Sequence, residues 1–245
     1  MIITDCYWEK RNLGVETVEI GIEKFDVYNK DVFLDLNTKY GYVVVKVPMN
    51  KTEFNFGLAE MGFSFVETQL NISKTFKTFP FEDRIIKTVF PHVSGTIIET
   101  NQELDEILGK ISSDMFSTDR IYIDSKFSHT SSSTRYKNWI ESEFSQKKCI
   151  VKKMYYDNEN VGFAMTKIQG DTQQRVLGGI FEKYQANGLG IMTASFNFIT
   201  AKKDNKPFKI LKTAISSNNT PVLQIYNYLN FKIDKMTYVF VKHNR

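Results

Sequence analysis

Apolar and polar positions recur along the chain with two periods, which together predict a mixed fold. Alternating or continuous short apolar runs predict strands, whereas apolar residues three and four positions apart predict helices. Strands are predicted at residues 15–22, 42–47, 63–72, 149–156, 161–169, 173–181, 208–215 and 231–241. Helices are predicted at residues 31–38, 51–61, 101–112, 135–145, 189–203 and 220–229. Helices interleaved with hairpins favour an α+β fold, a mostly antiparallel sheet flanked by helices.

Two units are predicted. Residues 73–100 are polar and aromatic and carry prolines, so we assign them to the crossing between units 1–100 and 101–245. Residues 114–122 are expected to form a loop. The polar tract 128–134 is expected to be an exposed loop whose last hydroxyls cap the following helix.

A weak internal repeat relates the two units. Segments 43–65 and 211–233 share the order strand, polar turn, helix, strand. Setting Phe63 on Phe231 places Gly62 on Asn230, and both residue types tolerate the left-handed conformation of a helix stop. The same alignment puts Leu58 against Tyr226, so only the second copy has a phenol there.

Charge and composition restrict the function. The net charge of +4 comes without any run of five like charges, which argues against a dedicated nucleic-acid binder but suits an anionic small-molecule ligand. No apolar run approaches the roughly 20 residues of a membrane span, and no secretion signal precedes the first strand. Two distant cysteines suggest a reducing, cytoplasmic environment, and the spacing of the three histidines predicts no metal site.

The first functional motif is the stretch 176–190, an apolar run that ends in Gln185-Ala186-Asn187-Gly188-Leu189-Gly190 before a long helix. A glycine-rich turn at a helix start presents backbone N–H groups to a phosphate. The Gly178-Gly179 pair would weaken the strand unless a bulge or a close backbone approach requires it. Alone, the motif is also compatible with an ordinary tight turn, and it matches neither the dinucleotide fingerprint nor a P-loop.

The second motif begins at Asn219 and ends at Phe231, with Tyr226 between them. Asn219 is expected to cap a helix that has Pro221 in its first turn. On this basis alone, Tyr226 is as well explained as an ordinary core residue.

Both motifs in this order resemble the GNAT superfamily of acyl-CoA-dependent N-acyltransferases. The family loop, Gln/Arg-x-x-Gly-x-Gly/Ala, matches Gln185, Gly188 and Gly190, while Asn230 departs from the usual glycine. The resemblance covers residues 101–245 and implies acetyl-CoA as donor and no metal. It assigns to the coenzyme Gly179, Ile180, Phe181, Gln185, Ala186, Asn187, Gly188, Leu189, Gly190, Asn219 and Tyr226.

A finer resemblance, to the dTDP-fucosamine acetyltransferases, rests on Trp8 with Asn12-Leu13-Gly14 and on residues 116–122 and 135–139. Those enzymes carry an incomplete GNAT-like unit at the N-terminus, in agreement with the internal repeat. The resemblance implies a nucleotide-linked amino-deoxysugar as acceptor, for which Arg120, Tyr122 and Arg135 are candidate ligands. An ordinary structural role for these three residues is at least as well supported.

The implied mechanism is direct transfer through a ternary complex, because neither cysteine lies in the motifs as an acyl carrier. Tyr226 would be the general acid, Asn219 would position the thioester, and a backbone N–H near Ile180 would polarise its carbonyl. The general base is open between Glu182 and a water chain. Two alternative functions remain: transfer to another small amine, antibiotic or peptide N-terminus, and a non-catalytic acyl-CoA sensor. Assembly as a homodimer is left open.

Overall fold

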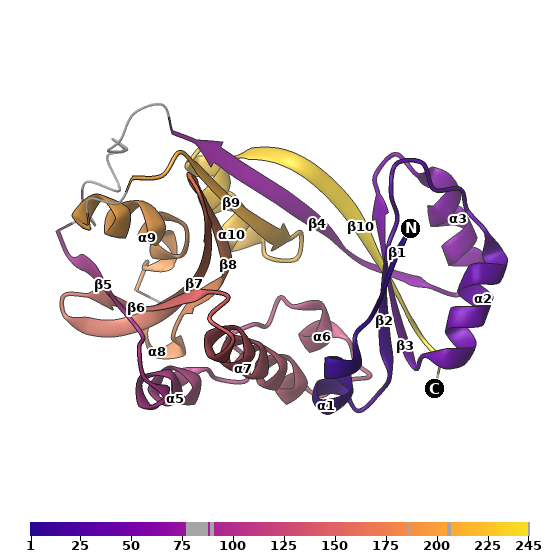
Figure 1. Ribbon diagram of the computed structural model, residues 1–245, viewed down its shortest axis with the longest axis horizontal. Coiled ribbons are helices and arrows are strands. Elements are labelled where there is room, and N and C mark those ends of the chain that lie inside the picture. The colour runs from indigo at the N-terminus through magenta and orange to yellow at the C-terminus, as the bar shows by residue number, and fades with distance from the viewer. Residues whose placement is uncertain (77–87, 89–90, 186, 205–206, 245) are drawn as a thin grey trace.

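A single sheet runs through the whole molecule (Figure 1). The computed structural model describes residues 1–76, 88, 91–185, 187–204 and 207–244. Within this part of the chain, ten strands form the order β1-β2-β3-β10-β4-β9-β8-β7-β6-β5. The predicted α+β class is therefore confirmed, with β2–β3 and β8–β9 as parallel pairs in an otherwise antiparallel sheet.

The elements follow the predicted periods closely. The strands are β1 Ile2–Asp5, β2 Thr17–Gly21, β3 Tyr42–Pro48, β4 Ser64–Thr75, β5 Val93–Ile97, β6 Ile150–Tyr156, β7 Glu159–Gln169, β8 Thr172–Ile180, β9 Ile210–Ser216 and β10 Lys232–His243. The described helices are η1 Tyr7–Glu9, α1 Lys10–Leu13, α2 Lys30–Lys39, α3 Thr52–Glu60, α5 Asn101–Lys110, α6 Arg120–Ile123, α7 His129–Ser145, α8 Glu182–Gln185, α9 Gly190–Lys203 and α10 Thr220–Tyr228.

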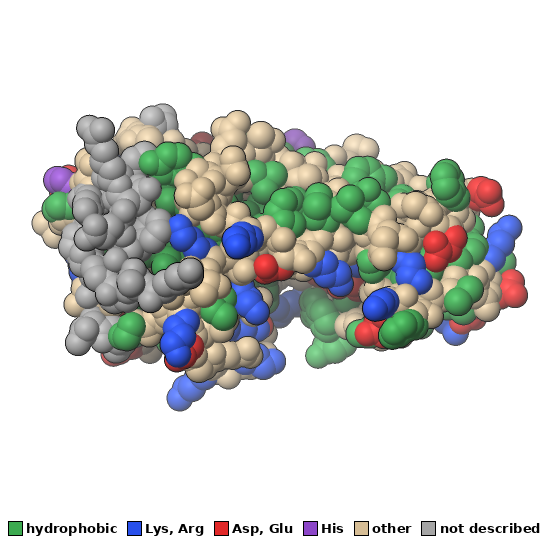
Figure 2. All heavy atoms as spheres, turned by 90° about the horizontal axis from the view of Figure 1, so that it is seen from above, with side chains coloured by type: hydrophobic (Ala, Val, Ile, Leu, Met, Phe, Trp, Pro, Cys, Tyr) green, Lys and Arg blue, Asp and Glu red, His purple; other side chains and the backbone are tan. Residues whose placement is uncertain are grey.

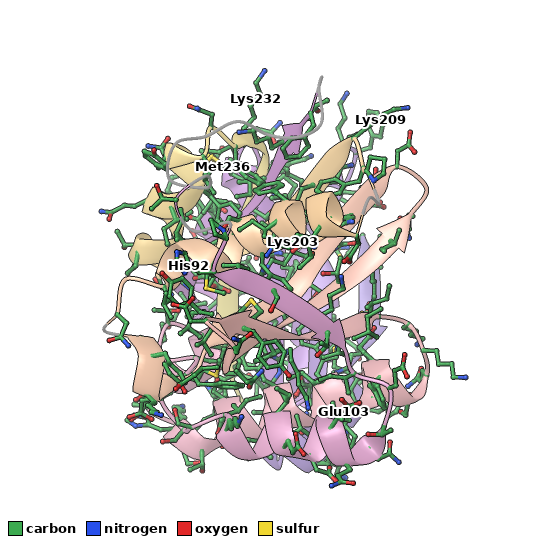
Figure 3. All side chains as sticks on the ribbon, turned by 90° about the vertical axis from the view of Figure 1, so that its left-hand side faces the viewer. His92, Glu103, Lys203, Lys209, Lys232 and Met236 are labelled. Carbon is green, nitrogen blue, oxygen red and sulfur yellow. The ribbon has the colours of Figure 1, made fainter. Side chains whose placement is uncertain are left out.

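Helices cover both faces of the second half of the sheet. The core beneath α9 and α10 contains Met192, Phe196 and Tyr226, whereas α5 and α7 enclose a separate core around Ile107 and Ile140. Figure 3 shows Glu103 of α5 and Lys203 of α9 on opposite sides of β5. In the first half, α2 and α3 pack on β2 and β3 through a third core.

The two halves exchange their last strands. β10 follows α10 in sequence but lies between β3 and β4, and β4 follows α3 but lies between β10 and β9. Gln69 of β4 pairs with Ser216 of β9, and the equivalent pair in the first half is Thr237 of β10 with Pro48 of β3. Because the registers agree residue by residue, the weak sequence repeat corresponds to a structural repeat.

The two helix stops of the repeat have the same backbone conformation. Gly62 has a φ of 78° and Asn230 a φ of 56°, both in the left-handed region. Asn adopts this conformation more readily than most residues, which explains why it can replace Gly at this position. The prediction that these two residues are equivalent stops is thus confirmed.

Each exchanged strand also ties down the helix end of the other half. Lys242 of β10 donates to the carbonyl oxygen of Met61 over 2.7 Å, at the end of α3. Lys74 of β4 donates in the same way to the carbonyl of Leu229, at the end of α10. An ammonium group at a helix C-terminus also compensates its negative dipole end. The halves are therefore joined by reciprocal polar contacts as well as by strand pairing.

Two loop predictions were wrong. The tract 128–134 is not an exposed loop, because α7 begins at His129 and buries Ser132 and Ser133. Ser132 is stabilised there by donating to Asp119 over 2.9 Å. Asp119 also caps α6, which begins inside the predicted loop 114–122. The helix α6 has only four residues, which are too few to show the apolar period by which a helix is recognised in sequence.

The surface carries charges of both signs. Figure 2 shows Lys and Arg side chains interspersed with Asp and Glu on the face seen from above, and a hollow between the two halves. Among the described residues, no helix has the length and apolar character that a bilayer crossing needs.

Candidate functional site

The central feature of the site is the point where β8 and β9 part. They pair in parallel for three residues, from Thr172 with Ile210 to Gln174 with Lys212, and both strands then continue without pairing to each other. A register shift in the β7–β8 ladder between Leu177 and Arg175 marks a bulge at this point. A bulge bends its strand, so β8 diverges from β9 and leaves a wedge between them.

On the wall of the wedge formed by β8, the backbone groups beyond Gln174 have no partner on β9. The N–H of Phe181 donates to Val161 of β7 over 2.9 Å. Successive N–H groups of a strand point to opposite edges, so the N–H of Ile180 faces the open side. The Ile180 carbonyl on that side accepts from Nε2 of Gln185 over 3.2 Å. This places the predicted Ile180 donor at the wedge and gives Gln185 a structural partner.

Both glycines of the Gly178-Gly179 pair have close neighbours, but only Gly178 is close to backbone of another strand. A Cβ at Gly178 would collide with the guanidinium of Arg175, and a Cβ at Gly179 would lie 2.6 Å from Cε of Met115. The two contacts come from opposite faces of the sheet, because Arg175 lies on the α9 side and Met115 lies with the α5–α7 core. The predicted need for close backbone approach is therefore explained at Gly178, where a Cβ would also lie 2.7 Å from the carbonyl oxygen of Phe163, whereas at Gly179 the end of the Met115 side chain could shift.

The glycine-rich loop lies at the mouth of the wedge. Gly188 has a φ of 70° and open space around its Cβ position, so its conformation rather than crowding requires glycine. Gly190 begins α9 and approaches Ile225 of α10, where a Cβ would lie 3.4 Å from the Ile225 side chain. Asn187 is exposed, and Leu189, like Phe181 before the loop, is buried. Ala186 lies outside the described residues.

Tyr226 lies inside the core beneath the wedge. Its side chain is 4% exposed, and its ring packs edge-on against Phe231. Burial raises the pKa of the Tyr226 phenol, while the positive charge of Arg175 and a hydrogen bond with Thr213 of β9 act in the opposite direction. The hydroxyl is thus a protonated donor at neutral pH, close to both strands of the wedge.

Asn219 caps α10 as predicted. Its side-chain oxygen accepts from the N–H of Val222 over 3.3 Å, and Pro221 lies in the first turn. The further role of positioning a thioester stays a prediction. Glu182, the candidate base, is exposed at the start of α8.

The candidate acceptor residues lie where α6 and α7 meet the first half of the sheet. Arg135 donates from Nε to Glu9 over 2.6 Å, and Arg120 lies 3.7 Å from a carboxylate oxygen of Glu67. Tyr122 donates to Asp114 over 2.9 Å. Each of the three side chains therefore has a partner within the protein, and their role toward an acceptor stays a prediction.

A cavity of about 350 Å³ opens on the face of the sheet opposite α9 and α10. Its lining is polar and comes from strands β4, β7, β8, β9 and β10: Asn71, Ile72, Lys167, Gln169, Thr172, Gln174, Lys212, Thr213, Ala214 and Asp234. Gln174 and Lys212 are the last paired residues before the wedge. The cavity therefore lies beside the point where the two strands part.

In the described ranges, no three His, Cys, Asp or Glu side chains lie close enough together to bind a metal ion. The sequence matches no family model and no curated protein. The arrangement of its elements, however, has clear counterparts among solved structures.

Three of these counterparts cover most of the chain. A GCN5-related N-acetyltransferase from Sphaerobacter thermophilus is 9% identical, with a TM-score of 0.54 over 83% of this chain and 60% of its own. A second, from Kribbella flavida, is 10% identical, with a TM-score of 0.55 over 93% and 81%. A tandem GNAT protein from the clavulanic acid biosynthesis pathway is 10% identical, with a TM-score of 0.53 over 94% and 75%.

The fold is the GNAT fold. The chain spans 60% of the length of the Sphaerobacter protein, and at these identities the likeness concerns the fold alone. The agreement with a tandem GNAT protein fits the two halves described above. The predicted boundary near residue 100 stays a prediction, although β5 already belongs to the edge of the second half.

Only one half of this GNAT fold has a wedge among the residues that the structure describes. The parallel pair β2–β3 of the first half corresponds to β8–β9, but it stays paired from Thr17 through Gly21. The N–H of Ile22 then still bonds to Lys46 over 2.9 Å. Leu58, the counterpart of Tyr226, is fully buried in an apolar core. The described first half therefore has no gap between its two parallel strands and no phenol at the position that corresponds to Tyr226.

Sequence reasoning missed Arg175. It lies on β8 and is 4% exposed, although the sequence shows it at the end of a polar stretch, directly before the apolar run and the glycines. The charge of Arg175 in a predicted strand could have drawn attention to it, because a charged side chain is rarely buried unless it has a partner.

Proposed function

We propose that this protein is an acyl-CoA-dependent N-acyltransferase. The observation that carries the proposal is the wedge between β8 and β9, which opens directly toward the glycine loop at the start of α9. Unpaired N–H groups and the positive end of the α9 dipole suit a pyrophosphate at the loop. An extended pantetheine arm would complete the open strand edge of the wedge, as an added strand does.

The chemistry follows from the groups around the wedge. The acceptor amine attacks the thioester carbonyl, whose developing negative charge the Ile180 N–H would stabilise. The carbon–sulfur bond then breaks as the amide bond forms, and Tyr226 would donate its proton to the departing thiolate. The proton lost by the amine returns through solvent to Tyr226. Acetyl is the simplest acyl group that this scheme accommodates.

For the acceptor, we propose the amine of a nucleotide-linked amino-deoxysugar. The polar cavity on the opposite face would admit a small acceptor to the thioester, and Lys167 and Lys212 on its wall would favour a phosphate-bearing one. Arg120, Tyr122 and Arg135 would act as further ligands only by giving up their present partners. Another small amine or a peptide N-terminus is the competing acceptor. A homodimer remains a further proposal.

The coenzyme site can be tested by calorimetry with free coenzyme A. Gly188→Glu should abolish binding, because a carboxylate at the loop repels the pyrophosphate and fills its place. Gly170→Glu is the matched control, since Gly170 also has a positive φ and open space but lies in the β7–β8 turn. The control should bind normally. Full affinity in the Gly188 variant would exclude the loop as the pyrophosphate site.

The acceptor can be tested by thiol release from acetyl-CoA with dTDP-4-amino-sugars, polyamines and peptides compared at equal concentration. A preference for the nucleotide sugars is expected. Turnover with peptides alone would identify a peptide as the acceptor. Binding of coenzyme A without turnover of any amine, from acetyl-CoA or from any other acyl-CoA, would favour the sensor alternative.

A further inference from the structure

Three arginines of the described chain are largely buried, and only two have carboxylate partners. Arg135 pairs with Glu9 and Arg120 with Glu67, at the junction of the two halves. Arg175 forms no ion pair with any described residue, and its Nη2 has no hydrogen-bond partner there. A buried charge is normally paired, so Arg175 points to a counter-charge that the folded chain does not supply.

The guanidinium of Arg175 has a hydrogen-bond partner on one of its edges. Its Nη1 donates to Oδ1 of Asn197 on α9 over 3.3 Å. The Asn197 amide is itself fixed, because its Nδ2 donates to Thr166 over 3.1 Å and to Gln173 over 2.9 Å. This network orients the guanidinium and leaves Nη2, the orphan atom, on the other edge.

That orphan atom lies at the reacting end of the wedge. It covers Gly178, the residue whose missing side chain makes room for it. Tyr226, the proposed acid, interacts electrostatically with Arg175, and this interaction raises the pKa of the guanidinium. Burial lowers the pKa of Arg175, but a guanidinium stays protonated at neutral pH even so. A fixed positive charge therefore faces the place where the acyl group of the donor would lie.

We infer that the acyl group of the donor ends in a carboxylate, as in malonyl-CoA or succinyl-CoA, and that Nη2 of Arg175 binds this carboxylate. The inference rests on the proposed function. The transition-state charges already have donors, because Ile180 serves the carbonyl oxygen and Tyr226 the sulfur. A permanent anion on the acyl group supplies the counter-charge whenever the donor is bound, which a neutral acetyl group cannot do.

Calorimetry on the whole protein tests the inference with succinyl-CoA and butyryl-CoA, which have acyl chains of equal carbon number. Wild-type protein should bind succinyl-CoA about tenfold or more tightly than butyryl-CoA, as expected for a charge-assisted hydrogen bond in a buried site. Arg175→Met should lose this preference and keep its affinity for free coenzyme A. Lys39→Gln, which removes an exposed positive charge on α2, should keep the preference.

The outcomes separate the inference from the proposed function. Equal affinities of the wild type for succinyl-CoA and butyryl-CoA would overturn the inference while the coenzyme site stands. Failure of the wild type to bind free coenzyme A would overturn the proposed function. The wild-type comparison needs no variant, so it decides between these outcomes even if Arg175→Met folds poorly.

Discussion

The unpaired charge of Arg175 predicts an unusual response of stability to mutation. Arg175→Met removes one hydrogen bond, worth about 1 kcal/mol, together with a buried charge whose uncompensated desolvation costs several kcal/mol. Methionine fills most of the same volume with apolar atoms. We therefore expect the free energy of unfolding of the ligand-free protein to rise by about 1–3 kcal/mol.

Arg135→Met is the matched comparison, because it removes a guanidinium that is also largely buried but does have a partner. Glu9, 5% exposed, would be left with an uncompensated charge, and the expected loss is about 3–5 kcal/mol. Urea unfolding followed by circular dichroism measures both changes. If Arg175→Met destabilised the protein as much as Arg135→Met, Arg175 would have a compensating partner in the folded chain and the reasoning would be refuted.

Further predictions concern the acid, the thiols, a helix stop and the number of sites. Tyr226→Phe should lower kcat about a hundredfold with little change in coenzyme affinity. In the wild type, the raised pKa keeps the Tyr226 phenol protonated, so kcat should not fall between about pH 7 and 9. Burial raises the pKa of Cys6 to about 11 and that of Cys149 to about 12, so both should react slowly with a thiol reagent at neutral pH and rapidly in urea. Asn230→Val should cost about 1–2 kcal/mol in urea unfolding because of its positive φ, whereas Asn227→Val in the α10 helix should cost less. Calorimetry should give one coenzyme per chain, and a stoichiometry of two would show that the first half also binds.

Local patterns in the sequence were sufficient for most elements of the fold. The predicted strand 42–47 became β3, and the predicted stop at Gly62 has the expected left-handed backbone. Short pieces escaped the pattern, because β1 is a four-residue edge strand with all its side chains exposed and so carries no alternation of burial. The tract 128–134 was misjudged because serine favours loops unless, as at Ser132, a buried acceptor satisfies its hydroxyl.

The arrangement of the site was less accessible from sequence. The loop glycines and Tyr226 could be found because each lies in a short motif whose residues are close together in sequence. The wedge depends on which strands pair and where the pairing stops. The position of the Arg175 guanidinium depends on a hydrogen bond to Asn197, which lies on a different element. Such long-range pairings leave no period in the sequence. The ion pairs of Arg120 and Arg135 with the first half are of the same kind, since their partners are distant in sequence.

Strand exchange makes each half of the sheet depend on the other half. β10 completes the sheet of the first half, and β4 completes that of the second, so neither half can form its sheet alone. In the first half, the described parallel strands stay paired and Leu58 stands where the second half has the phenol, while β4 supports β9. Pairing along β9 fixes the position of Thr213, the hydrogen-bond partner of Tyr226. The first half therefore contributes to the position of Tyr226 in the second half through strand pairing alone.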